Sequence, residues 1–86
     1  MSKLDLFVDL DTKSDIRKWF QKLLDHGINF HPDDSFGDYV DQNGKRLFTR
    51  AEARRLNSTM GDAFAIAGDQ VYDIGLARIR KHLKRR

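Results

Sequence analysis

Apolar and mostly acidic residues alternate along the first part of the chain. The alternation covers residues 4–11, and a period of two predicts a half-buried β-strand there. A second β element is predicted around Asn43-Gly44, because this dipeptide favours a two-residue hairpin turn. With such a turn, Val40 would face Leu47 across the hairpin.

The next segment has apolar residues at intervals of three and four, which predicts an amphipathic helix. Its core-facing residues are Ile16, Trp19, Phe20, Leu23 and Leu24. Ser14, or alternatively Thr12, can cap its start, and Asp15 places a carboxylate at the positive end of the helix dipole. Gly27 can end the helix in a left-handed conformation.

Two further helices are predicted in the second half of the chain. Thr49 and Glu52 have the spacing of a capping box, which opens a helix that Gly68 ends. The apolar stripe of this helix comprises Ala53, Leu56, Met60, Ala63, Phe64 and Ala67. Asp69 can cap a third helix. The inner arc of the third helix comprises Val71, Tyr72, Ile74, Gly75, Leu76, Ile79 and Leu83.

The fold class predicted from these patterns is mainly α. Three amphipathic helices would surround one core, with a minor β element at the N-terminus, at Asn43-Gly44, or at both. A chain of 86 residues supports one modest core. We therefore expect residues 1–86 to form a single small globular domain.

Composition narrows the class of protein further. Hydrophobic residues make up 40% of the chain and charged residues 34%, which is typical of a soluble globule. Cys is absent, so disulfides and thiolate chemistry are excluded. The acidic N-terminus does not resemble a secretory signal, and no apolar run is long enough for a membrane span. We expect a cytoplasmic protein with no membrane partner and no cofactor.

Charge is distributed unevenly between the two halves of the chain. Residues 1–41 contain nine Asp and five Lys or Arg, a net charge of −4, whereas residues 42–86 contain four acids and eleven bases, a net charge of +7. Two interpretations remain open. The halves attract each other within the fold, or the basic half binds an acidic or nucleic-acid partner.

The basic residues of the second half are candidates for contacts with phosphate groups or acidic side chains. They are Arg50, Arg54, Arg55, Arg78, Arg80, Lys81, Lys84, Arg85 and Arg86. The sequence contains no recognisable nucleic-acid module, such as paired stacking aromatics on strands. Nucleic acid is therefore a possible partner but not the favoured one.

An Asp-rich connector in the middle of the chain is the candidate partner-binding segment. Its candidate residues are His31, Asp33, Asp34, Asp38 and Asp41. The first four could alternatively hold a divalent metal or support metal-assisted hydrolysis, although such catalysis needs at least three converging ligands. Residues 41–52 also approximate a calcium-binding loop, but Lys45 and Arg46 occupy positions that require an oxygen ligand and a glycine.

No nucleophile–base pattern or glycine-rich phosphate loop stands out in the sequence, and no small-molecule substrate can be identified. We therefore favour a small non-enzymatic module that binds an unknown protein partner. The alternatives are a nucleic-acid or acidic-partner binder that uses the basic C-terminal helix, and a metal-binding domain or metal-assisted hydrolase centred on the Asp-rich connector.

Overall fold

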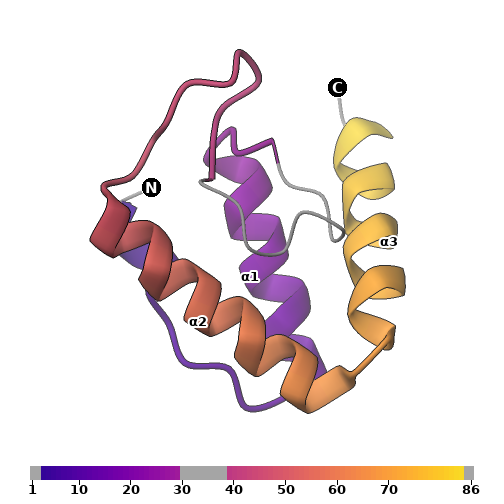
Figure 1. Cartoon of the computed structure of the whole chain (residues 1–86). Coiled ribbons are helices and arrows are strands. Elements are labelled where there is room, and N and C mark those ends of the chain that lie inside the picture. Colours follow the sequence, from indigo (N-terminus) through magenta and orange to yellow (C-terminus); the bar gives the residue numbers. More distant parts are fainter. Residues whose placement is uncertain (1–2, 30–38, 85–86) are drawn as a thin grey trace.

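The computed structural model describes residues 3–29 and 39–84, and this part of the chain is mainly helical. Its elements are the short 3-10 helix η1 (Lys3–Leu6) and the α-helices α1 (Lys13–Asp25), α2 (Arg50–Ala67) and α3 (Gln70–Lys84). Figure 1 shows α2 crossing in front of α1, while α3 lies beside α1 and runs in the same direction. The radius of gyration of 11.9 Å is that of a compact chain of this length.

The boundaries of α1 follow from local hydrogen bonds, and of the two cap residues that the sequence offers, Thr12 and not Ser14 starts the helix. Thr12 is the N-cap: its hydroxyl accepts a hydrogen bond from the Asp15 backbone N–H at 3.2 Å, and the Asp15 carboxylate accepts one from the Thr12 N–H at 3.0 Å. Hydrogen bonds from the backbone N–H groups of Asp11 and Thr12 lower the pKa of Asp15. Gly27 ends the helix with a φ of 77°, which a residue without a Cβ adopts readily.

The interior is formed by the apolar faces of all three α-helices together with η1. Its fully buried large side chains are Leu6, Ile16, Trp19, Phe20, Leu23, Ile28, Leu56, Met60 and Val71. The Trp19 Nε1–H donates a hydrogen bond of 2.9 Å to the backbone carbonyl of Leu6, so this tryptophan holds η1 against α1. The prediction of three helices around a shared core is confirmed.

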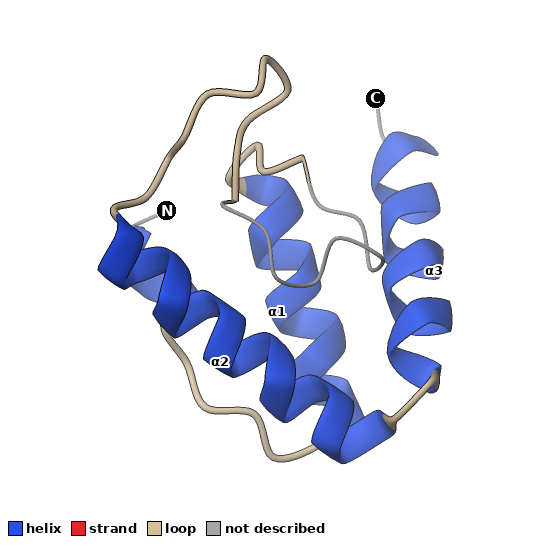
Figure 2. Ribbon diagram, in the orientation of Figure 1, coloured by secondary structure: helices blue, strands red, loops and turns tan. Residues whose placement is uncertain are grey.

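The N-terminal strand predicted over residues 4–11 is wrong. The structure has η1 there instead, with Leu6 fully buried and Leu4 74% exposed. The described residues contain no neighbouring strand, so an extended segment would leave its backbone groups unpaired (Figure 2). A 3-10 turn satisfies some of these groups locally and still points Leu6 inward.

The segment around Asn43-Gly44 forms a turn, but not the predicted two-residue hairpin. Val40 pairs with Arg46 in an isolated antiparallel bridge and does not face Leu47. The reason lies in Asp41, whose carboxylate accepts backbone N–H bonds from Asn43 at 2.8 Å and Lys45 at 2.9 Å. These bonds widen the loop to residues 41–45. Apart from this bridge, the part of the chain that the structure describes has no β structure, so the minor β element is not confirmed.

Only some of the residues predicted to face the core from α3 are buried. Val71 and Gly75 are buried, whereas Tyr72, Leu76 and Leu83 remain 37%, 38% and 56% exposed. The helix packs against α1 and α2 on one side, whereas Asp73, Arg80 and Lys84 on its opposite side are exposed. No helix in the described ranges has the length and apolar character needed to cross a membrane.

Candidate anion-binding groove between α1 and α3

Two adjoining hollows lie along the line where α3 packs against α1. Arg17 of α1 and Arg78 of α3 line both hollows, which measure about 310 Å³ and 440 Å³, so we treat them as one feature, the α1–α3 groove. The α1 side is lined by Ser14, Arg17, Lys18, Gln21 and Lys22. The α3 side is lined by Asp73, Ile74, Ala77, Arg78 and Lys81.

Helical periodicity places these side chains in the groove. In α1, Ile16 and Trp19 point into the core, so Arg17 and Lys18 project beside it. In α3, residues 74, 77, 78 and 81 follow one another at helical intervals and form one face. Because α1 and α3 lie side by side, the two sets of side chains line a common groove.

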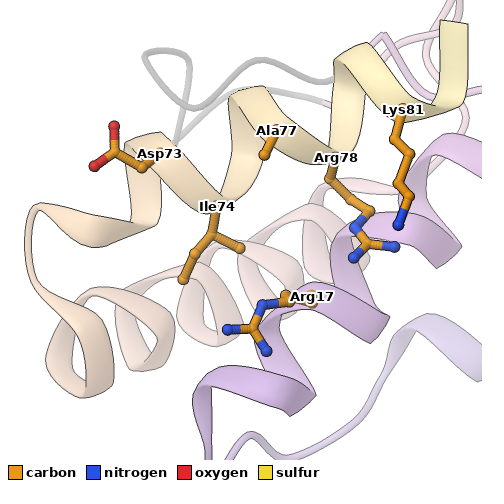
Figure 3. A pocket seen from close by; sticks show the side chains of 6 residues that line it. All are labelled: Arg17, Asp73, Ile74, Ala77, Arg78 and Lys81. Atoms are coloured by element: carbon orange, nitrogen blue, oxygen red, sulfur yellow. The ribbon is translucent and has the colours of Figure 1, made fainter. Parts of the chain in front are cut away.

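The groove is strongly basic. Its cations are Arg17, Lys18, Lys22, Arg78 and Lys81, five of the ten lining residues, and Asp73 is the only acid among the ten, which gives the lining a net charge of +4. Figure 3 shows Arg78 and Lys81 pointing from α3 toward α1, with Arg17 across from them and Asp73 pointing away. Within residues 3–29 and 39–84, none of the five cations forms an ion pair. Such a concentration of one charge attracts anions.

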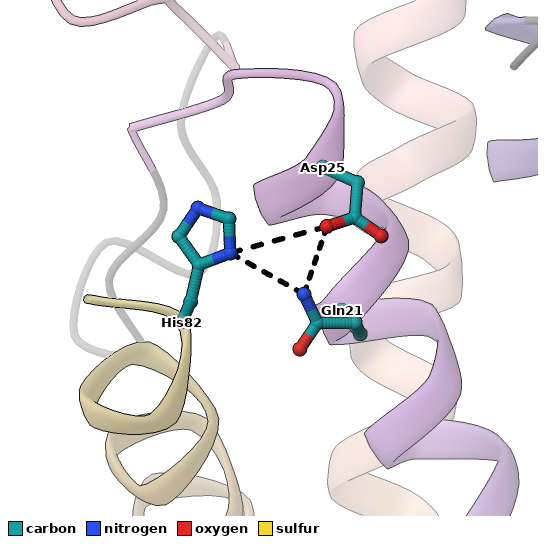
Figure 4. A network of polar contacts seen from close by, with 3 residues as sticks. All are labelled: Gln21, Asp25 and His82. Atoms are coloured by element: carbon teal, nitrogen blue, oxygen red, sulfur yellow. Dashed lines mark hydrogen bonds and ion pairs between the residues drawn. The ribbon is translucent and has the colours of Figure 1, made fainter. Parts of the chain in front are cut away.

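A small polar network ties the C-terminal end of α3 to α1 at one end of the groove (Figure 4). The Gln21 side-chain N–H donates a hydrogen bond of 2.9 Å to the Asp25 carboxylate. His82 of α3 reaches both residues, with its Nδ1 lying 3.3 Å from Gln21 Nε2 and 3.9 Å from Asp25 Oδ1. These contacts join positions 61 residues apart in the sequence and fix the spacing of the two helices.

The structure brings together only part of the basic set predicted from the sequence. Arg78 and Lys81 lie in the groove, while Arg80 and Lys84 are exposed on α3 outside it. The predicted Arg50, Arg54 and Arg55 belong to the start of α2, which Figure 1 places on the far side of the molecule from α3. Arg55 instead stacks over the Phe7 ring, 5.2 Å from its centroid. Arg85 and Arg86 lie outside the described residues.

Most of the Asp-rich connector also lies outside the described residues, namely His31, Asp33, Asp34 and Asp38. The remaining member, Asp41, uses its carboxylate to hold the 41–45 turn. In the calcium-loop interpretation Glu52 would be the last ligand, but its carboxylate accepts the Thr49 backbone N–H at 2.8 Å. Among the residues that can be described, no three His, Asp or Glu side chains converge as metal ligands would.

Sequence reasoning missed the α1 half of the groove. Arg17, Lys18 and Lys22 look like ordinary solvent-facing residues of an amphipathic helix. Only the packing of α1 against α3 shows that they face Arg78 and Lys81. The sequence does show cations along one side of each of these two helices. Those cations predict a shared site only if the two helices are already known to be neighbours.

No family model, curated protein or solved structure gives a match to this chain. The assignment of a function therefore depends on the groove itself.

Proposed function

We propose that the chain is a non-enzymatic binding module whose α1–α3 groove takes an acidic segment of a partner protein. The observation that carries this proposal is the convergence of five cations from two helices beside a single lining acid, Asp73, which leaves a net charge of +4 on the ten lining residues. Keeping like charges together is unfavourable in the free protein. An anionic partner would offset this repulsion among the cations, so the groove favours the binding of an anion.

The other lining residues favour a peptide over a nucleic acid. Ile74 and Ala77 add an apolar floor beside the cations, which suits aliphatic side chains interleaved with carboxylates. None of the ten described lining residues is an aromatic on which a base could stack, although stacking is the usual means of binding single strands.

The described lining residues also lack the groups expected of an active site. Catalysis by proton transfer requires an acid and a base placed within reach of each other. Among the ten lining residues, Asp73 is the only carboxylate, and there is no His or Cys. Binding is therefore the activity that this arrangement supports.

A direct test is fluorescence anisotropy with a labelled peptide in which Glu and Leu alternate. We expect salt-sensitive binding by the wild type and a loss of tenfold or more in affinity for Arg17→Glu/Arg78→Glu, or about 1.4 kcal/mol or more. The matched control is Arg50→Glu/Arg54→Glu, which makes the same change of net charge on exposed residues of α2 outside the groove.

Two outcomes would contradict the proposal. Equal losses in the groove variant and in the α2 variant would show that net charge alone governs binding. Preferential binding of a random oligonucleotide at the same ionic strength, abolished by Arg17→Glu/Arg78→Glu, would assign the groove to nucleic acid.

A further inference from the structure

A line of large apolar side chains runs along α3 on the side opposite the groove. Its members are Tyr72, Leu76, Ile79 and Leu83, the α3 strip, which follow one another at intervals of four, three and four residues. Residues so spaced share one face of a helix. Three of them are more than a third exposed, and Ile79 is half-buried.

The α3 strip is held in place by the monomer itself. The Tyr72 ring packs edge-on against Phe64 of α2, with ring centroids 5.5 Å apart. Ile79 also packs against the core. An apolar line that is ordered before any partner arrives loses little side-chain entropy on association. Contiguous apolar surface of this kind marks an interaction site more often than isolated exposed leucines do.

We propose that the α3 strip pairs with the same strip of a second copy of this chain, with the two α3 helices antiparallel. A twofold axis between positions 77 and 78 places Tyr72 opposite Leu83 of the second copy. The same axis places Leu76 opposite Ile79, so each apolar residue meets another. The apolar contacts alone would also permit a parallel pair, so the choice of direction depends on the charged residues beside the strip.

Charge complementarity supports the choice of a second copy. Asp73, Arg80 and Lys84 are exposed on the solvent-facing side of α3, directly beside the strip. We call the side of α3 that carries Asp73, Arg80 and Lys84 its charged flank. In an antiparallel pair the twofold axis is perpendicular to both helices, so the charged flank of one copy lies next to the charged flank of the other. Asp73 then lies between Arg80 and Lys84 of the second copy, and the contact is made twice. In a parallel pair the twofold axis would bring opposite flanks together, so Asp73 would not meet Arg80 and Lys84 of the second copy.

Asp73 is available for this contact. Although it borders the groove, its carboxylate points away from the groove cations (Figure 3), and it forms no ion pair within the described structure. One helix from each copy makes a contact smaller than a standard interface. We therefore expect a reversible dimer whose population depends on concentration.

Sedimentation equilibrium of the full chain, over a range of concentrations, tests the dimer. The wild type should shift toward twice the 10.0 kDa monomer mass as concentration rises. Leu76→Asp should keep the monomer mass over the same range. Leu4→Asp, which alters an exposed leucine in η1, is the matched control and should dimerise like the wild type. A wild type that is monomeric throughout would overturn the proposal, as would a dimer that Leu76→Asp leaves intact.

A charge exchange tests the antiparallel arrangement without disturbing the apolar contact. Asp73→Lys makes the flank wholly basic, and Arg80→Glu/Lys84→Glu makes it wholly acidic. Each variant alone should be monomeric at concentrations where the wild type dimerises, and an equimolar mixture should form the heterodimer. Far-UV circular dichroism verifies that both variants are folded. Equal dimerisation of the separate variants, or a folded mixture that stays monomeric, would overturn the proposed pairing.

Discussion

Tyr39 combines two unfavourable features in one residue. Its φ of 57° lies in the left-handed region, at a cost of about 1–2 kcal/mol for a residue with a side chain. Its side chain is only 8% exposed, and within residues 3–29 and 39–84 the buried hydroxyl has no hydrogen-bond partner. Burial of the ring against Phe48, with centroids 6.3 Å apart, offsets these costs. The residue is thus held by packing and not by polar contacts.

We expect Tyr39→Phe to leave stability at pH 7 unchanged or to raise it by about 1 kcal/mol, because it removes a buried hydroxyl that no described residue pairs with. Burial raises the pKa of Tyr39 above 10.0, so the folded protein keeps this proton at a pH where the unfolded chain releases it. The free energy of unfolding of the wild type should therefore fall as the pH rises above 10.0. Relative to the variant, which lacks this hydroxyl, the wild type should lose about 1.4 kcal/mol more for each pH unit. Urea denaturation of both proteins between pH 7 and about pH 11 measures this difference, and parallel curves would contradict it.

Capping boxes start both α1 and α2, and the one at Thr49 and Glu52 allows an element-scale prediction. The Thr49 hydroxyl accepts the Glu52 N–H at 3.2 Å, and Glu52 accepts the Thr49 N–H at 2.8 Å. Thr49→Ala/Glu52→Ala should lower the free energy of unfolding by about 1–2 kcal/mol through the loss of both bonds. The measurement is chemical denaturation with and without EDTA.

The same experiment separates capping from calcium binding. A cap is a property of the polypeptide, so the loss should be equal in both buffers, whereas a calcium site would show it only with the ion present. Ser58→Ala, an exposed change in the middle of α2, is the control and should stay within about 0.5 kcal/mol of the wild type.

Elements set by local contacts were predictable from the sequence, and those set by distant contacts were not. The caps at Thr12 and Thr49 join atoms three residues apart, so the residue pattern identified the cap at Thr49 and reduced the cap of α1 to Ser14 or Thr12. The position of η1 depends instead on Trp19, 13 residues beyond the carbonyl that it binds. Alternating apolar residues from Leu4 onward suit a strand only if another strand is present to pair with it.

The candidate site illustrates the same limit over a longer separation. Arg78 was identified from the basic C-terminal helix, whereas Arg17 joined the site only through the packing of α1 against α3. The contact between Gln21 and His82 spans 61 residues, and no local pattern announces such a pairing. Sequence reasoning therefore located cations but could not show which of them converge.

At the scale of the whole molecule, the groove should lower the stability of the free protein. Five like charges lie along one contact between two helices, and repulsion among them opposes the packing of α3 against α1. Binding sites commonly retain such unfavourable arrangements because the partner requires them. Three of the five cations, Arg17, Lys18 and Lys22, come from the acidic half of the chain, so the groove does not follow the charge division seen in the sequence.

Arg78→Gln should therefore stabilise the free protein in dilute buffer. Removing one of several like charges relieves about 0.2–0.5 kcal/mol, which corresponds to a rise in melting temperature of about 1–4 °C for a chain of this size. The gain should vanish in about 1 M NaCl, where the Debye length falls to about 3 Å. Arg54→Gln removes an equal charge from the exposed side of α2 and should give a smaller shift. If Arg78→Gln instead destabilises the protein at low salt, Arg78 supports the packing of α3. The cations of the groove would then have a structural role, and their convergence would not indicate an anion-binding site.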